Sequence, residues 1–557
     1  MSSITEAVPN VLKQLPASHH GPGGAVAILE DGNVLGQHVW GYADIDQRIP
    51  MTPETMMPIC SITKQMVCMC LKALERQLQS QLGGDDDQVQ SHLEAHFREV
   101  CPDNLDSFAG ASRPSLRQLC DNQSGLRDYW ALTTLWGARP DGVFSLPEAG
   151  EKMLERPGAP HFPPGTQYSY ANTNFHILAR VIERCSSGCS PSGNKPLGEW
   201  LREQVFTPAA MASACLHPDN ASLPGDCVGY EGDAARGYIA AVNRIHWSGD
   251  AGVVASLADM IAYEKFLHRS QADETSIYRE MALPPTFADG TPAPYGYGLQ
   301  HVVVAGVPTV GHGGALRGYR LHRRHVPSRK LSVIVMFNHE ANAEMAAQDI
   351  LARLLKKDEV LRSVSHSVTL SAQTWPGSYW DEEACLAIEV KHRPDPGDIV
   401  VTYAGEPDTL VPVRPDRAES RTTLATLEEG RLRLDWPQAN RHITAHRLVR
   451  SPTQPDGKAF AGTYACSELD SIFHCAESGG QLYGYFDGFL GRGPVHFMRY
   501  LGECKNGPVW ALACPRGMDA PAPGDWSLCF TRNEDQSVSG VTVSCWLARR
   551  AVFARRS

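Results

Sequence analysis

A serine and a lysine with the spacing of a nucleophile and its base stand in the segment ICSITK. Ser61 precedes Lys64 by three positions, at the point where the sequence turns helical. Because positions i and i+3 of a helix face the same way, both side chains would project together. A serine hydroxyl needs a base within hydrogen-bonding distance to attack an acyl group. The pair therefore suggests a serine hydrolase with Ser61 as nucleophile and Lys64 as base.

The same spacing occurs a second time, so the surroundings must separate function from chance. The second copy runs from Ser192 to Lys195 in a Gly/Pro-rich loop, and we interpret it as a coincidence. Around Ser61, the unpaired N–H groups of a helix start favour developing negative charge. The apolar neighbours Met57 and Met66 would help to lower the pKa of a buried lysine. The alternative is an ordinary helix cap followed by a surface lysine.

Two further motifs follow along the chain. Tyr170 and Asn172 form a Y-x-N pair just before a predicted helix, where a phenol could relay a proton to the leaving group. His312 is followed by two glycines, which let a substrate backbone approach a strand edge closely. We expect the N–H groups of Ala315 and Ser61 to form an oxyanion hole. The alternatives are a core tyrosine and a structural histidine.

The elements that must position these residues are strands at both ends of a first region, with helices between them. Two apolar runs that flank EDGN predict a β-hairpin. Short strands follow residue 300, and for the basic cluster RLHRRH among them we expect a solvated strand face or a domain interface. This order indicates one antiparallel sheet covered by helices. Helical patterns cover residues 62–74, 174–184, 256–267, where Ser256 is placed to cap with Asp259, and about 341–356.

The pattern of the sequence changes after about residue 365. Helical patterns almost vanish, and short alternating runs separated by Gly, Pro, Asp and Asn predict an all-β region. The similar starts WPGSYW and FAGTYA, at 375 and 460, indicate two small β domains, each a barrel or a sandwich. We therefore predict a catalytic domain over 1–360 and β domains over 366–455 and 456–557.

Composition limits the class of function. The chain of 557 residues is 42% hydrophobic and 20% charged, which is ordinary for a globular protein, and its net charge of −11 argues against nucleic acid as a partner. We see no signal peptide and no stretch of ~18 apolar residues, so we expect a cytoplasmic protein without a membrane partner. No spaced ligand set predicts a metal or cofactor, and we interpret CSSGC, from Cys185, as an incidental loop.

The order of S-x-x-K, Y-x-N and a His-x-Gly element resembles the penicillin-recognising serine hydrolases, which include β-lactamases, D-Ala-D-Ala peptidases and related esterases. The sequence is more similar still to their D-stereospecific aminopeptidase branch, over nearly the whole chain. The resemblance implies an α+β, β-lactamase/penicillin-binding-protein-like catalytic domain, two eight-stranded antiparallel β-barrels and a homodimer. The segments that carry it include MPICSITKQ, NQSGLRDYWAL, GDAGVVASLADMIA, GHGGALRGYR and GMDAPAPGDW.

The resemblance also implies a reaction and a substrate site. The expected reaction is release of an unblocked N-terminal D-amino acid, typically D-alanine, through an acyl-enzyme on Ser61. A loop of the last domain, residues 515–525, would enter the cleft, and its Asp519 would meet the substrate's amino group. Gln300 departs from the pattern, because a relative has asparagine there. The expected catalytic residues are Ser61, Lys64, Tyr170 and His312, and the expected substrate contacts are Asn172, Gln300, Gly313, Gly314, Ala315 and Asp519.

Three functions remain open at this level. They are a D-aminopeptidase, a related esterase, amidase or β-lactamase-like hydrolase with another acyl specificity, and a binding protein that kept the fold without catalysis. The intact motifs argue against the third. Asp519 separates the first two, because an exopeptidase must recognise a charged amine and an esterase need not. Its own alternative is a plain carboxylate in a loop rich in Pro, Asp and Gly.

Overall fold

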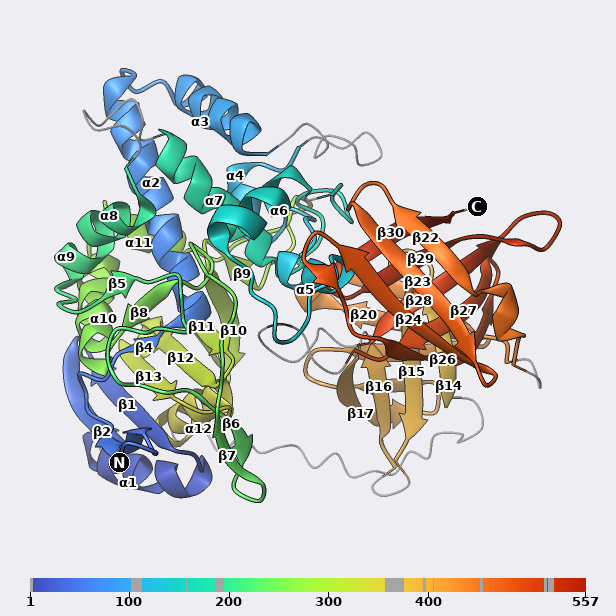
Figure 1. Ribbon diagram of the computed structural model, residues 1–557. Helices are drawn as coiled ribbons and strands as arrows, with labels where there is room; N and C mark the ends of the chain where they lie inside the picture. Colours follow the sequence, from blue (N-terminus) through green and yellow to red (C-terminus); the bar gives the residue numbers. More distant parts are fainter. Residues whose placement is uncertain are drawn as a thin grey trace.

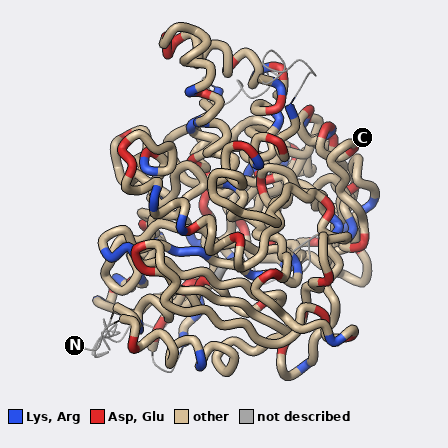
Figure 2. Tube along the Cα trace, turned by 90° about the vertical axis from the view of Figure 1, so that its left-hand side faces the viewer, with Lys and Arg blue, Asp and Glu red and all other residues tan. Residues whose placement is uncertain are grey.

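The computed structural model shows an α+β domain, coloured blue to yellow, beside two β-barrels coloured gold and orange to red (Figure 1). Among the described residues, no helix is long and apolar enough to cross a membrane. Acidic and basic residues are interspersed along the trace (Figure 2). The residues described by the structure are 4–101, 113–156, 158–185, 195–355, 375–393, 397–403, 405–450, 454–514, 518 and 525–556.

The α+β domain is built on an antiparallel sheet with the order β3-β2-β1-β13-β12-β11-β10-β9. The predicted hairpin is confirmed: Glu30 pairs with Asn33 across a turn at Asp31 and Gly32. Both turn residues have positive φ, as the two-residue hairpin turn requires. The strands are β1 (Gly23–Glu30), β2 (Asn33–Asp44), β3 (Ile49–Pro50), β9 (Tyr295–Gly296), β10 (Leu299–Val304), β11 (Val307–Leu316), β12 (Tyr319–Val326) and β13 (Leu331–Phe337).

Helices cover both faces of this sheet, and they divide its core into two layers. Val26 and Ile28 of β1 pack with α1 and α12, whereas Ala25 and Ala27 belong to the layer that contains α2 and α10. Side chains alternate across a strand, so a continuous apolar run fills both layers. The main helices are α1 (Ile4–Ser18), α2 (Thr63–Gln81), α3 (Asp86–Val100), α7 (Asn172–Cys185), α10 (Leu257–Ala272) and α12 (Ala343–Leu355).

Two of these helices were not expected from the sequence, and one predicted cap is confirmed. α1 contains Pro9 and Pro16, and α3 begins with the acidic run Asp85, Asp86 and Asp87. Ser256 and Asp259 form the predicted capping box at the start of α10. The shorter elements are α4 (Leu116–Cys120), α5 (Tyr129–Leu135), α6 (Glu151–Glu155), α8 (Leu197–Leu201), α9 (Thr207–Ala209), α11 (Ile277–Met281), β4 (Met57–Pro58), β5 (Cys215–Leu216), β6 (Tyr230–Asp233), β7 (Gly237–Ala240) and β8 (Val253–Ala255).

The C-terminal third of the chain forms two closed antiparallel barrels, which confirms the expected fold class. Eight strands close the first barrel. In the second, the pairing of β23 with β24 closes a ring of eight, and the two-residue β25 extends β24. The first barrel contains β14 (Gly377–Asp381), β15 (Leu386–His392), β16 (Ile399–Tyr403), β17 (Glu406–Arg414), β18 (Arg417–Glu419), β19 (Leu424–Glu428), β20 (Arg431–Trp436) and β21 (Arg441–Arg447). The second contains β22 (Gly462–Cys466), β23 (Ser471–Ser478), β24 (Gln481–Gly488), β25 (Gly491–Arg492), β26 (His496–Cys504), β27 (Gly507–Leu512), β28 (Trp526–Arg532), β29 (Val538–Cys545) and β30 (Ala548–Arg555).

Candidate active site

Ser61 lies in a short 3-10 turn, Cys60–Ile62, that leads directly into α2. The preceding Cys60 has φ 53°, a left-handed conformation that costs free energy for a residue other than glycine. The turn is held from outside by the N–H of Ile59, which donates to the carbonyl of Val253. Strand β11 packs closely against it, because a Cβ at Gly314 would lie only 2.6 Å from the carbonyl oxygen of Ile59. The glycine therefore lets the strand and the serine turn form one wall.

Lys64 is fully buried under Ser61, with Nζ 3.0 Å from the serine Oγ. The same Nζ lies 2.8 Å from Oδ1 of Asn172 and 2.7 Å from the carbonyl oxygen of Asp250. These last two atoms can only accept hydrogen bonds. A neutral amine has two N–H donors and one lone pair, so its lone pair would face the serine hydroxyl. The arrangement suits proton transfer from Ser61 to Lys64.

Burial sets the acidity of this lysine. Removal of Nζ from water lowers the pKa of Lys64 to about 8, although the nearby carboxylates of Asp250 and Asp128 act in the opposite direction. Desolvation disfavours the charged form of an amine, whereas a negative neighbour favours it. A lysine with this pKa is partly neutral near neutral pH, which a surface lysine is not. The alternative of a surface lysine after a helix cap is wrong, because Lys64 has no exposed surface.

Buried aspartates hold the partners of the lysine in place. The carboxylate of Asp128 accepts from the backbone N–H of Asn172 at 3.0 Å and from its Nδ2 at 3.1 Å. These contacts fix the Asn172 amide with its oxygen toward Lys64. Asp250 accepts from the Tyr129 hydroxyl at 2.6 Å. Neither aspartate was assigned a role from the sequence, although both lie in segments that carry the family resemblance.

Tyr170 and His312 lie close to each other in the cleft that contains Ser61. The Tyr170 ring centroid lies 4.9 Å from Lys64 Nζ and 6.2 Å from the ring centroid of His312. Desolvation raises the pKa of Tyr170 well above its usual range, and a hydrogen bond with Ser61 acts in the opposite direction. The phenol therefore stays protonated at ordinary pH and can donate a proton to the leaving group.

His312 is buried and makes two hydrogen bonds of its own. Its Nδ1 contacts the carbonyl of Gly313, and its Nε2 lies 2.8 Å from the hydroxyl of Tyr295. Since a carbonyl can only accept, Nδ1 carries the proton and Nε2 accepts from the tyrosine. Burial lowers the pKa of His312 to about 3, so the ring is neutral above that pH. This geometry favours a positioning role over a role as base.

We expect Tyr170→Phe to lower kcat by ~10²–10⁴-fold, the usual contribution of a general acid or base, because the change removes only the hydroxyl. The measurement is kcat on a D-alanyl amide, with Tyr168→Phe, a neighbouring tyrosine ring 5.7 Å from Tyr295, as the matched control. A loss of less than about threefold would assign Tyr170 a structural role.

The edge of β11 provides the opposite wall of the cleft. Pairing of β10 with β11 ends at Gln300 and Gly311, whereas β12 pairs with β11 as far as Leu316. The second half of β11 is therefore an edge that faces Ser61. Ala315 is exposed on this edge, and its N–H stays our predicted partner of the Ser61 N–H in the oxyanion hole.

A cleft of about 470 Å³ brings the predicted residues together. Gln300 lines it and accepts a hydrogen bond from Arg324 at 3.1 Å. Asp519 lies outside the described residues, so its role stays a prediction. The predicted residues that line the cleft are Ser61, Tyr170, Asn172, Gln300, His312, Gly313, Gly314 and Ala315, and those not predicted include Asp128, Trp130, Trp247, Arg320, His322, Glu340, Glu344 and Leu547.

The basic cluster on β12 corrects one expectation. His322, Arg323 and Arg324 have no exposed surface, so this is not a solvated strand face. Arg323 forms a two-pronged ion pair with Glu264 of α10, and Arg324 pairs with Glu344 at 3.2 Å. The cluster lies within the catalytic domain, where sheet and helices bury it between them.

Comparison with protein families matches two parts of the chain. Residues 8–357 match the family described as Beta-lactamase, and residues 368–554 match the family described as D-aminopeptidase, domain B. The first match extends over more than half of the chain, and it coincides with the domain that carries the serine, the lysine and the cleft. Fold and site thus define a serine hydrolase of the β-lactamase-like class.

Curated relatives extend over almost the whole chain. The D-aminopeptidase of Brucella ovis is 41% identical over 544 residues, 97% of this chain and 97% of the relative. That of Brucella anthropi is 41% identical over 551 residues, 99% of this chain and 98% of the relative. The chain belongs to the D-aminopeptidase family, which confirms the resemblance in the motifs. The solved octameric penicillin-binding protein homologue from Pyrococcus abyssi is also similar, at 19% identity and a TM-score of 0.48, over 80% of this chain and 100% of that one.

Proposed function

We propose that this enzyme releases an unblocked N-terminal D-amino acid, preferably D-alanine, from peptides, amides or esters through an acyl-enzyme on Ser61. The observation that carries the proposal is the contact of Ser61 Oγ with a buried lysine whose pKa is lowered to about 8. On the family resemblance alone we also propose that the enzyme works as a homodimer.

The proposed reaction has two halves. Neutral Lys64 takes the proton of Ser61 as Oγ attacks the carbonyl carbon, and the N–H groups of Ser61 and Ala315 stabilise the oxyanion. Tyr170 then protonates the leaving amine as its C–N bond breaks, and it recovers a proton by way of Lys64. In the second half, water gives a proton to the same base and attacks the ester carbonyl. The C–O bond to Ser61 then breaks, Lys64 returns the proton to Oγ, and the D-amino acid leaves.

The aminopeptidase specificity requires recognition of a free ammonium group. The residue before Asp519, Met518, is 2% exposed, and its Cε would lie 3.5 Å from a Cβ at Gly142 of the catalytic domain. Met518, the described neighbour of Asp519, therefore packs against the domain that Asp519 is proposed to serve. A carboxylate that meets an ammonium in a cleft poor in water forms a charge-assisted hydrogen bond of about 1.5–3 kcal/mol. An N-acylated substrate would leave that carboxylate unpaired.

The test compares D-Ala-, L-Ala- and N-acetyl-D-Ala-p-nitroanilides. We expect Asp519→Asn to lower kcat/KM for D-Ala-p-nitroanilide by ~10- to 200-fold. The change in kcat/KM for the N-acetylated substrate should be far smaller. The control is Asp525→Asn, because Asp525 contacts Arg499 at 3.9 Å and does not line the cleft. If Asp519→Asn leaves the ratio of kcat/KM for the free and the N-acetylated substrate unchanged, the proposed recognition of the amine by Asp519 is wrong. An esterase or amidase function then gains support.

A further inference from the structure

A turn of the last barrel reaches the catalytic cleft at Leu547, a residue to which no role was assigned from the sequence. Between β29 and β30, the carbonyl oxygen of Leu547 accepts the backbone N–H of Asp128 at 2.9 Å. Leu547 is 9% exposed, and that exposed surface lines the cleft. Asp128 is the residue whose carboxylate holds Asn172 beside Lys64. The turn is therefore one residue away from the catalytic hydrogen bonds.

A buried arginine of the catalytic domain fixes the backbone of this turn. Arg127 is 3% exposed, and its Nε donates to the carbonyl of Arg549 at 2.9 Å. Its Nη2 lies 3.4 Å from the carbonyl of Arg550, and its Nη1 lies 2.8 Å from Glu468 of the same barrel. A guanidinium donates in a rigid planar geometry, so the two carbonyl contacts fix the chain that follows the turn, and the third contact holds the same arginine against Glu468.

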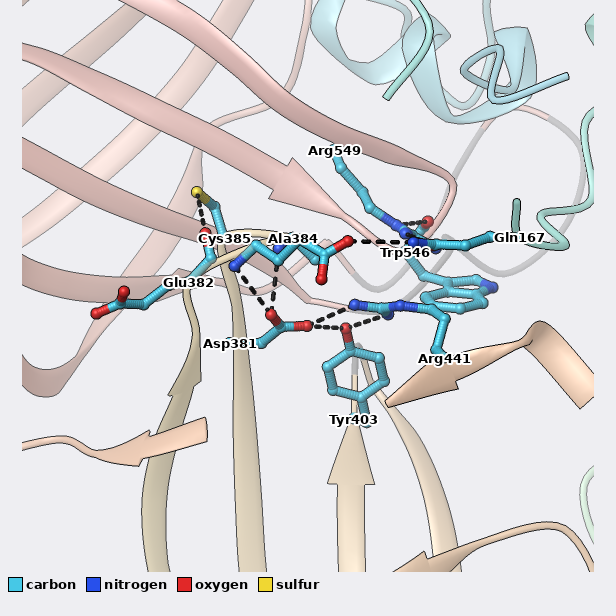
Figure 3. Close-up of polar contacts among 10 residues, drawn as sticks. Gln167, Asp381, Glu382, Ala384, Cys385, Tyr403, Arg441, Trp546 and Arg549 are labelled. Atoms are coloured by element: carbon cyan, nitrogen blue, oxygen red, sulfur yellow. Dashed lines mark hydrogen bonds and ion pairs between the residues drawn. The ribbon is translucent and has the colours of Figure 1, made fainter. Parts of the chain in front are cut away.

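The outer side of the turn is held by the first barrel (Figure 3). Trp546 stacks on Trp436 with ring centroids 4.9 Å apart, and the guanidinium of Arg441 lies over the Trp546 ring. Arg549 donates to Gln167 of the catalytic domain at 3.2 Å. All three domains thus contact the turn, and the side chain of Leu547 presents a fixed surface to the cleft.

The cleft is lined by both apolar and polar side chains. Leu547 is one of the apolar ones, together with Trp130, which follows Asp128 by two residues, and Trp247, which packs 6.1 Å from Tyr129. The polar ones include Arg320 and Glu340, which pair with each other, and Glu344 and Gln300, which both contact the buried Arg324. An apolar acyl side chain is favoured against the apolar part of this lining, because burial there removes apolar surface from water on both partners.

We propose that Leu547 is a specificity-determining residue: it forms the wall against which the side chain of the substrate's N-terminal residue packs, and it thereby limits that side chain to a small one. The proposal rests on the proposed function, since it places the acyl side chain of a D-amino acid against the apolar surface that Leu547 contributes. It adds a second contribution of the last barrel, separate from the loop that carries Asp519.

The experiment measures kcat/KM for D-Ala-, D-Leu- and D-Phe-p-nitroanilides with Leu547→Ala. Because each methylene that a pocket admits or rejects changes kcat/KM by roughly 10- to 200-fold, we expect the D-Leu to D-Ala ratio to rise at least ~10-fold. Leu547→Phe should lower kcat/KM for D-Ala-p-nitroanilide relative to kcat/KM for glycyl-p-nitroanilide. The matched control is Leu490→Ala, because Leu490 contacts Trp136 at the same domain interface without lining the cleft.

Each outcome decides the proposal. An unchanged D-Leu to D-Ala ratio in folded Leu547→Ala would overturn it, as would an equal rise in Leu490→Ala. If a thermal melt shows that Leu547→Ala is not folded, Leu547→Val is measured instead, because it shortens the same side chain with less loss of volume. The ratio of kcat/KM for the D-Leu and D-Ala substrates must rise in this variant too. If the unaltered enzyme does not turn over any free-amine D-substrate, the proposed function fails. The comparison of a small with a large acyl group is then made with p-nitrophenyl acetate and p-nitrophenyl 4-methylpentanoate. These esters lack an amine, so they test the packing of the acyl group against Leu547 alone.

Discussion

Ser61→Ala is expected to lower kcat on D-Ala-p-nitroanilide by more than ~10⁴-fold. Removal of a hydrolase nucleophile commonly costs several orders of magnitude, because the remaining groups act as a unit with it. The side chain of Ser61 is partly exposed to the cleft, so loss of one oxygen should leave the fold intact. Intact-protein mass spectrometry after a brief reaction with substrate should show an acyl adduct on the unaltered enzyme and none on the variant.

The second S-x-x-K copy supplies a control of the same chemistry. Ser192→Ala removes a hydroxyl with the same spacing to a lysine, and we expect it to retain full activity. Lys195, the partner in that copy, pairs with Glu203 and lies over the ring of Trp200, away from the cleft. If Ser61→Ala kept a tenth of the unaltered kcat, or if Ser192→Ala lost activity instead, Ser61 would not be the nucleophile.

The catalytic motifs could be predicted because each is local. Ser61 and Lys64 are one helical turn apart, so the sequence alone places them side by side. The two helices that were missed also had local signals. In α1, buried Val8, Val11, Leu12 and Leu15 recur at helical spacing, and in α3, Asp85 caps a helix whose buried residues are Val89, Leu93, Phe97 and Val100. Prolines in the first and acidic residues in the second concealed an amphipathic pattern.

The supports of the catalytic lysine could not be derived from spacing, because only the fold brings them together. Asp250 is 186 residues from Lys64, and Asp128 is 44 residues from the asparagine that it holds. Leu547 comes from another domain altogether. No periodicity connects such positions. The same applies to the burial of Arg323, which depends on a carboxylate 59 residues away on a helix.

The second large effect is expected for Lys64→Met, which should lower kcat by ~10³-fold or more. Methionine has about the length of lysine and is tolerated in apolar surroundings, so it can fill the buried space. It removes the base and also the donor to Asn172 Oδ1 and to the Asp250 carbonyl. Some destabilisation is therefore expected, and a thermal melt must show that the variant is folded when kcat is measured. A folded variant with more than a tenth of the activity would contradict the role as base.

The pH dependence tests the same role without a mutation. Because burial lowers the pKa of Lys64 to about 8, and only the neutral amine can accept the serine proton, kcat/KM should rise with pH up to about 8 and then level off. Asp128, whose pKa burial raises to about 7, loses its proton in the same range, whereas His312, with a pKa of about 3, does not. The residual activity of Lys64→Met separates the two groups. If it keeps the same rise with pH, the titrating group is Asp128, and the assignment of Lys64 as base is wrong; if the rise is lost, Lys64 is the group that controls the rate.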